Sequence, residues 1–259
     1  MLNCMSKPNP MKYLITLSLL LACFCLRAQD SIKTLRTTGG TISLKGGMIP
    51  KTDTNQVYYD EKGKALRHYQ YDKILRTGEY RLVPSSDRSL PQKMVITKLS
   101  EEEINRFNAL IRESTKINTP YVYEGKKLDL APLTAFYEQN KMENKVILQI
   151  YWYAGCSTCT EKFAEISAFV KELGDPKDLL ILAITTDDND VAVKKLKEQP
   201  LRNAELISSG RAVSDAYQFT RYPVYIVSDK NQIIKYAVVG SSRLTIPDLK
   251  TAVKAALGK

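Results

Sequence analysis

The chain has 259 residues, of which 44% are apolar and 25% are charged. This composition is typical of a globular protein and excludes wholesale disorder or a collagen-like chain, and the length allows one large domain or two modest ones at roughly 150 residues each. The single histidine, His68, excludes most histidine-based metal sites and any catalytic triad with a histidine elsewhere.

Basic residues exceed acidic residues, giving a formal net charge of +10. Lys7, Lys12 and Arg27 lie in the first 28 residues, which hold no acidic residue, and without these three charges the net charge falls to +7. The other basic residues are scattered along the chain rather than clustered, and no zinc-finger spacing occurs. We therefore expect no nucleic-acid partner.

Residues 1–28 have the features of an export signal. Lys12 supplies a positive start, Tyr13–Cys25 is an almost unbroken apolar run, and Ala28 offers a small residue for cleavage. A run of this length suits a signal peptide and is too short for a comfortable membrane span. We predict a signal peptide and a periplasmic or otherwise extracytoplasmic mature protein. In an alternative interpretation, the Leu-Leu-Ala-Cys sequence resembles a lipobox, and Cys23 carries a lipid anchor.

Residues 29–114 form a polar region with paired glycines and turn signals, and residues 56–59 and 79–83 are predicted strands. Ser100 and Glu103 have the spacing of a capping box and predict one helix. The apolar face of this helix is formed by Ile104, Phe107, Leu110 and Ile111. We recognise no motif in this region and assign it no role.

Residues 115–259 alternate between strand and helix patterns. The continuous apolar runs are typical of strands covered on both faces, and the final helix is predicted to be capped by Thr245 and Asp248. The alternation describes an α/β sandwich. In chain order, strands are predicted at 146–152, 179–185, 204–208, 224–227 and 233–239, and helices at 163–173, 191–198, 213–217 and 245–257.

Only two of the five cysteines, Cys156 and Cys159, follow the predicted signal, and they are spaced C-x-x-C. No second cysteine or histidine pair completes a zinc site, so we expect no metal. A purely structural disulfide would close only a tiny loop and stabilise the fold little. The spacing therefore favours a redox dithiol, with an inert disulfide or a vestigial pair as the alternatives.

The position of the pair, between a strand and a helix, suits thiol–disulfide exchange. A cysteine in the first turn of a helix faces unpaired backbone N–H groups, which favour its thiolate form. We therefore predict that Cys156 is the exposed nucleophile. Cys159 lies one turn later, on the same face and more buried, from where it can resolve a mixed disulfide.

Three segments resemble a known family. Tyr151–Cys159 resembles the active-site run of thioredoxin-like proteins, and Arg221–Val227 resembles their cis-proline segment. Tyr123–Leu130 is similar to the lead-in of TlpA/ResA-type exported thiol–disulfide oxidoreductases. The resemblance covers about residues 115–259. It implies an α/β fold, a thioredoxin-like sandwich with a central mixed sheet, preceded by a smaller polar N-terminal region of mixed strands and one helix.

The resemblance also implies roles for individual residues. Pro223 would pack against the cysteine pair and leave the backbone of Tyr222 free to pair with an extended substrate. Trp152 would lie in the core or shape the substrate groove. No bound cofactor is needed, because electrons pass between thiols. The implied partners are disulfides of exported proteins or peptides and a membrane-embedded thiol donor or acceptor.

The sequence departs from the family at two positions near the cysteines. Gly155 stands where tryptophan is common, and Ile150 stands where a buried carboxylate or amide often lies. An alternative function is therefore a redox-inactive thioredoxin-fold module that binds a partner through residues 29–114. A peroxidase is disfavoured, because Tyr153 occupies the position of the peroxidatic threonine. Copper delivery is disfavoured because its C-x-x-x-C motif is absent.

Overall fold

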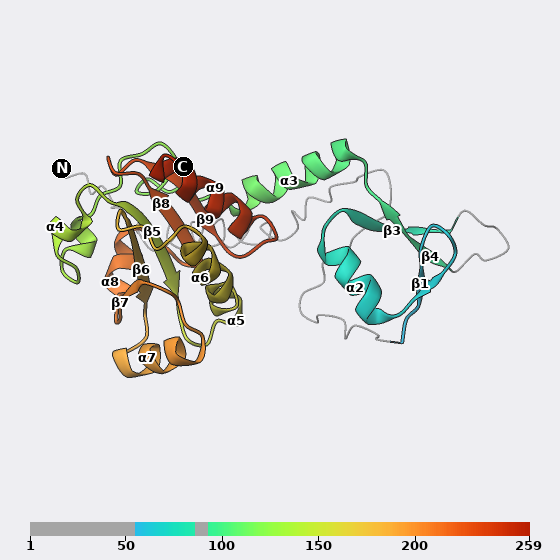
Figure 1. The fold of residues 1–259 in the computed structure, drawn as a ribbon, viewed down its shortest axis with the longest axis horizontal. Helices are drawn as coiled ribbons and strands as arrows, with labels where there is room; N and C mark the ends of the chain where they lie inside the picture. Colours follow the sequence, from blue (N-terminus) through green and yellow to red (C-terminus); the bar gives the residue numbers. More distant parts are fainter. Residues whose placement is uncertain (1–54, 86–92) are drawn as a thin grey trace, which may run out of the picture. The chain divides into compact units, whose positions relative to one another are not determined.

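The structure, a computed structural model, describes residues 55–85 and 93–259 (Figure 1). The predicted signal peptide, the Cys23 lipid-anchor alternative and the first part of the N-terminal region lie outside the described residues. None of the helices in the described ranges has the length and apolar character needed to cross a bilayer.

The first part of the described chain contains a small four-stranded sheet. Its strand order is β2-β1-β4-β3, in which β1 and β4 are parallel and the other neighbours are antiparallel. The elements are β1 (Tyr58–Tyr59), β2 (Ala65–Leu66), α2 (His68–Arg76), β3 (Tyr80–Pro84) and β4 (Met94–Lys98).

The core beside this sheet is small. Its buried members are Leu66, Tyr71 and Ile96. His68 is partly buried, and the centroid of its ring lies 5.2 Å from that of Tyr71. Helix α2 was not predicted from the sequence. It begins where the backbone N–H of Arg67 donates to the side chain of Gln70, a local bond that its mixed polar sequence did not reveal.

Helix α3 (Glu101–Thr115) begins at the predicted capping box. The backbone N–H of Glu103 donates to the Ser100 hydroxyl (3.2 Å), and the Ser100 backbone N–H donates to the Glu103 carboxylate (3.0 Å). The predicted apolar face is not buried, however. No residue of α3 is buried, and Phe107 and Leu110 are 40% and 60% exposed.

The second part of the chain is built on a five-stranded mixed sheet of order β7-β6-β5-β8-β9. Strands β5, β6 and β7 are parallel, whereas β8 and β9 are antiparallel to their neighbours. This confirms the predicted mixed sheet. The strands are β5 (Val146–Trp152), β6 (Leu179–Thr185), β7 (Ala204–Ile207), β8 (Val224–Ser228) and β9 (Ile234–Val239).

Helices cover both faces of this sheet (Figure 1). Alternate residues of β5 are divided between two apolar clusters. Leu148 and Ile150 pack with α6 and α9, while Ile147 and Tyr151 pack with α8 and the 3-10 turn. The helices are η1 (Ala131–Leu133), α4 (Gln139–Met142), α5 (Ser157–Thr160), α6 (Phe163–Glu172), α7 (Asn189–Glu198), α8 (Arg211–Ala216) and α9 (Thr245–Leu257).

The segment that precedes the sheet runs along its edge strand β9. Lys116 forms an antiparallel bridge with Val238, and Lys127 forms one with Ile233. Between these bridges, the backbone N–H of Gly125 donates to the carbonyl of Ile234. The connecting segment is therefore tied to β9 at both of its ends.

The predicted cap of the last helix is wrong in its details. The N-cap residue of α9 is Leu244, and it makes no side-chain cap bond. The Thr245 hydroxyl instead accepts from the backbone N–H of Ser242 (2.8 Å). The Asp248 carboxylate accepts two bonds from the guanidinium of Arg112 on α3, at 2.8 and 2.9 Å. Asp248, which local spacing had assigned to the helix cap, thus forms a long-range ion pair with Arg112 instead.

Candidate active site

The two cysteines form a disulfide at the start of α5, directly after the central strand β5. Their sulfur atoms are 2.07 Å apart, and their Cα atoms are 5.3 Å apart. Tyr153, Ala154 and Gly155 link the end of β5 to Cys156, whose backbone N–H donates to the Tyr153 carbonyl (3.0 Å). The structure thus brings together the two residues that the sequence singled out.

The two cysteines differ in exposure, although less than the sequence suggested. Cys159 is fully buried, and Cys156, expected to be an exposed nucleophile, is only 7% exposed. Cys156 is also the N-cap residue of α5: its Sγ accepts from the backbone N–H of Cys159 (3.2 Å) and lies 3.4 Å from the Thr158 hydroxyl. In the reduced protein, a backbone N–H that donates to this sulfur would favour its thiolate form.

The Tyr222–Pro223 segment lies at the same end of the sheet, and the peptide bond between these residues is cis. Strand β8 begins at Val224, which pairs with Tyr151, so Pro223 comes one step further, level with Trp152. The ring of Tyr222 lies edge-on to the ring of Tyr153, with centroids 5.7 Å apart. Tyr222 also packs against the apolar cluster that includes both cysteines.

Trp152 belongs to the core beneath the disulfide. It is fully buried, and its ring meets the ring of Phe163 edge-on at 5.4 Å. A side chain in this position does not present a surface to a substrate. The exposed aromatic side chain of the loop is instead Tyr153, at 39%, which the sequence analysis treated only as part of the motif.

Ile150, six residues before Cys156, is an apolar residue with no ionised group opposite it on the neighbouring strand. Ile150 is fully buried and pairs across the strands with Tyr225. The Tyr225 hydroxyl is buried and has no hydrogen-bond partner among the described residues, and burial raises the pKa of this phenol well above its usual range. The group opposite Ile150 is therefore a neutral hydroxyl.

One polar residue near the site was missed by the sequence analysis. Asp187, in the turn after β6, accepts a hydrogen bond from the backbone N–H of Ala154 (2.6 Å). It lies 33 residues from Ala154 in the chain, so no local pattern could have paired them. The only sequence signal is its place directly after a strand that neighbours β5.

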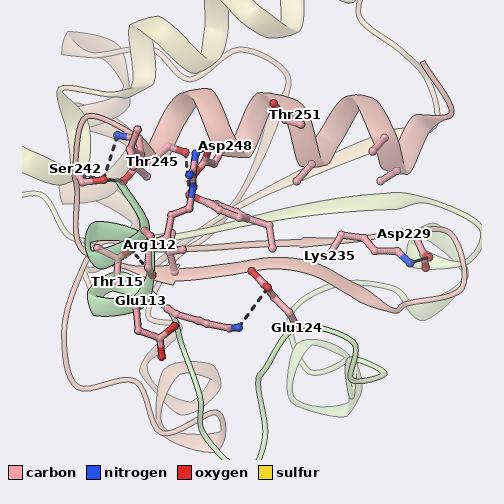
Figure 2. A pocket seen from close by; sticks show the side chains of 18 residues that line it. Arg112, Glu113, Thr115, Glu124, Asp229, Lys235, Ser242, Thr245, Asp248 and Thr251 are labelled. Atoms are coloured by element: carbon pink, nitrogen blue, oxygen red, sulfur yellow. Dashed lines mark hydrogen bonds and ion pairs between the residues drawn. The ribbon is translucent and has the colours of Figure 1, made fainter. Parts of the chain in front are cut away.

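A cavity of about 940 Å³ lies elsewhere in the described residues, between α9, β9 and the end of α3 (Figure 2). Most of its charged side chains form ion pairs, as Arg112 does with Asp248, and its lining includes Tyr236 and Val238. Neither cysteine lines it. Within the described ranges, no group of three or more metal-ligating side chains is close enough to hold an ion.

The fold and the disulfide agree with the comparison to known families. Residues 128–253 match the Redoxin family model. They form a thioredoxin-like domain. This match, the mixed sheet and the Cys156–Cys159 disulfide confirm the thioredoxin-like superfamily that the motif suggested. No curated protein sequence matches the chain.

Solved structures similar to this domain include the following three. A putative thiol:disulfide interchange protein DsbE from Chlorobium tepidum is 19% identical, over 46% of this chain and 84% of that one, with a TM-score of 0.42. The thioredoxin domain of a thiol-disulfide oxidoreductase from Bacteroides vulgatus is 22% identical (45% and 82%, TM-score 0.38). A secreted disulfide oxidoreductase from Mycobacterium tuberculosis is 12% identical (46% and 87%, TM-score 0.39).

Proposed function

We propose that the protein is an exported oxidoreductase that reduces or exchanges disulfides of other exported proteins through Cys156 and Cys159. The observation that carries this proposal is the disulfide itself: its two sulfurs are joined at the start of a helix, in one residue that is fully buried, Cys159, and one that is 7% exposed, Cys156. This difference suits two successive roles in exchange, attack and resolution.

The reductive reaction starts from the reduced pair. The Cys156 thiolate attacks one sulfur of the substrate disulfide, a mixed disulfide forms, and the other substrate sulfur leaves as a thiolate that takes up a proton. Cys159 then loses its proton and attacks the Cys156 sulfur, which releases the second substrate thiol. Two electrons have passed to the substrate, and the pair is oxidised, as in the structure. Oxidation of a substrate dithiol is the reverse sequence.

The neighbouring loop supplies the substrate contacts in this proposal. The backbone at Tyr222 and Pro223 would receive an extended substrate segment, because proline offers no N–H and leaves its neighbour's groups free to pair. Tyr153 would flank the same segment with its exposed ring, while Trp152 supports the loop from below. No bound cofactor takes part, since the electrons travel between sulfur atoms.

The cellular setting rests on the N-terminus and on a similar protein. The apolar run after Lys12 supports a signal peptide over residues 1–28, followed by a region at 29–114 and the thioredoxin-like domain at 115–259. One similar structure is described as secreted, which supports a periplasmic or other extracytoplasmic location. A lipid on Cys23 is the alternative anchor. A reductase in an oxidising compartment needs a membrane-embedded thiol donor, and an oxidase needs an acceptor.

Substitution of each cysteine tests this function. We expect Cys156→Ser to lower the rate of reduction of a disulfide-bonded peptide by at least 1000-fold, since the attacking sulfur is lost. Cys159→Ser should instead accumulate the mixed disulfide, visible as a mass increase equal to the peptide. Ser157→Ala, between the two, should stay within threefold of wild type. The same assay with and without a membrane fraction identifies the electron partner.

A second candidate is a redox-inactive module that binds a partner through residues 29–114. The slight exposure of Cys156 and the apolar Ile150 favour it. If this is the function, the reduced wild-type protein will reduce the peptide no faster than the Cys156→Ser variant. Partner capture would then be lost on changing residues 29–114 and kept in Cys156→Ser.

A further inference from the structure

The loop that carries Cys156 is held by a side chain from the neighbouring strand. Strands β5 and β6 are parallel and in register, with Trp152 opposite Thr185, so the loops that follow them leave the sheet at the same edge. Asp187 lies two residues beyond Thr185. Its Oδ2 accepts from the backbone N–H of Ala154 at 2.6 Å, two residues before Cys156.

The carboxylate is itself oriented by its own turn. Oδ2 of Asp187 also accepts from the hydroxyl of Thr185 (2.8 Å), and the backbone N–H of Asp187 donates to that same hydroxyl (3.1 Å). Thr185 is almost fully buried. The two residues therefore form a closed pair in which the carboxylate has little freedom to rotate away from Ala154.

The loop after β7 holds the turn from Thr185 to Asp187 in place. The backbone N–H of Ser209 donates to the carbonyl of Asp187 (2.8 Å), and that of Gly210 donates to the carbonyl of Thr185 (2.7 Å). A Cβ on Gly210 would lie 2.9 Å from the Cγ2 of Ile184, so this approach depends on glycine. Three loops at one edge of the sheet are thus linked by hydrogen bonds that end at Ala154.

We propose that Asp187 is a positioning residue for thiol–disulfide exchange, which holds the 153–155 loop, and with it Cys156, through the amide of Ala154. The Asp187 oxygen lies 2.6 Å from the Ala154 nitrogen, and an amide oxygen at the same place can accept the same bond. Ala154 is followed by Gly155, the most freely rotating residue type, and the loop's own backbone restraint is the bond from the Cys156 N–H to the Tyr153 carbonyl. The expected effect on thiol–disulfide exchange rests on the proposed function, whereas the hydrogen bond between Asp187 and Ala154 does not.

Two variants of Asp187 separate the hydrogen bond from the charge. Asp187→Ala removes the acceptor, and we expect kcat/KM for a disulfide-bonded peptide to fall at least tenfold. Asp187→Asn keeps an amide oxygen that accepts from Ala154, so it should remain within threefold of wild type. Asp190→Asn is the matched control, because it removes a carboxylate from the first turn of α7 that makes no bond to the loop.

Two further measurements do not depend on turnover. Hydrogen exchange of the Ala154 amide, resolved by NMR, should be at least tenfold faster in Asp187→Ala and within threefold of wild type in the two asparagine variants. The pH profile of alkylation of reduced Cys156 should move in Asp187→Ala, because the loop no longer holds the sulfur near the α5 amides. If Asp187→Ala does not fold, Thr185→Val, which removes only the orienting hydroxyl, should give a smaller change in the same direction.

The proposal is overturned if amide exchange and kcat/KM in Asp187→Ala are both within twofold of wild type. It is also overturned if Asp187→Asn is as impaired as Asp187→Ala, since the charge rather than the bond would then matter. If the wild-type protein shows no thiol–disulfide exchange activity at all, the proposed function fails. The rate of hydrogen exchange at the Ala154 amide then still decides whether Asp187 holds the loop.

Discussion

The two sheets differ most in how much apolar side chain each encloses. Every residue of β5 is buried, whereas neither residue of β1 is. The five-stranded sheet has an apolar cluster on each face, and the four-stranded sheet has one cluster with three buried members. Stability from burial scales with the apolar area removed from water, so the cysteine pair is built on the more stable of the two regions.

This difference has a functional sense. Exchange requires that two sulfurs and a loop keep a fixed geometry while a substrate arrives, and a rigid scaffold supplies it. The smaller sheet has a core with three buried members, and the helix that follows it exposes Phe107 and Leu110. The five-stranded sheet is therefore the scaffold that holds the cysteine pair, and the stability of the four-stranded sheet can be measured separately against it.

The largest expected effect comes from alkaline pH. Burial raises the pKa values of five tyrosines in the thioredoxin-like domain, and the four most deeply buried of them are Tyr151, Tyr217, Tyr225 and Tyr236. Above pH ~10 these phenols ionise in the unfolded chain but stay protonated in the folded one, so stability is intact below pH ~10 and falls as the pH rises. We expect a loss of about 5 kcal/mol at pH 11.

The measurement is urea unfolding between pH 8 and 11.5, with phenolate absorbance recorded in parallel. Phenolate absorbance from these residues should appear only as the domain unfolds. Full ionisation of all tyrosines before the unfolding transition would contradict the prediction, because it would show that the hydroxyls are accessible in the folded state.

A matched pair of core substitutions comes next. Leu148→Ala removes a fully buried side chain from the larger core and should cost about 4 kcal/mol, while Leu66→Ala in the smaller core should cost about 2 kcal/mol. Trp152 is the only tryptophan, so its fluorescence follows the thioredoxin-like domain alone. Leu66→Ala should shift the circular dichroism transition and leave the fluorescence transition unchanged. If both transitions move together, the two regions unfold as one unit.

Loss of the helix cap should have a smaller effect. Ser100→Ala removes the hydroxyl that accepts from Glu103 and should destabilise α3 by about 1 kcal/mol. The expected sign is a lower midpoint for helix unfolding by circular dichroism, with peptide reduction unchanged. A Ser100→Thr variant, which keeps the cap, is the control, and equal loss in both variants would argue against the capping role.

The smallest expected effect is a gain. Tyr225→Phe removes a buried hydroxyl that has no partner among the described residues, so no hydrogen bond is lost. We expect stability to rise by up to about 1 kcal/mol and the alkaline loss to shrink by one tyrosine's share. A drop in stability on removing the hydroxyl would show that it is bonded in solution.

The sequence predicted the thioredoxin-like domain well because its strands are continuous apolar runs. The predicted strand bounds 146–152 and 179–185 agree with β5 and β6. Helix α2 was missed because its sequence mixes charges and aromatics, and its start depends on Arg67 and Gln70 rather than on a usual cap. The prediction that Thr245 and Asp248 cap the last helix was wrong because Asp248 pairs with the distant Arg112.

The candidate site was predictable only where it is local in sequence. The C-x-x-C spacing places both sulfurs together, and Pro223 follows at a recognisable distance. The burial of Trp152 and the near burial of Cys156 depend on packing from other elements. The bond between Asp187 and Ala154 depends on the parallel register of two strands, which a single sequence does not display.

The bridges from Lys116 and Lys127 to β9 bear on how this protein can be shortened. An unpaired edge strand offers its backbone to any other strand and is a common start of aggregation. A fragment that begins at residue 128, where the family match begins, would strip the outer cover from β9. One that begins at residue 115 keeps the cover, and we expect it to stay monomeric where the shorter one self-associates.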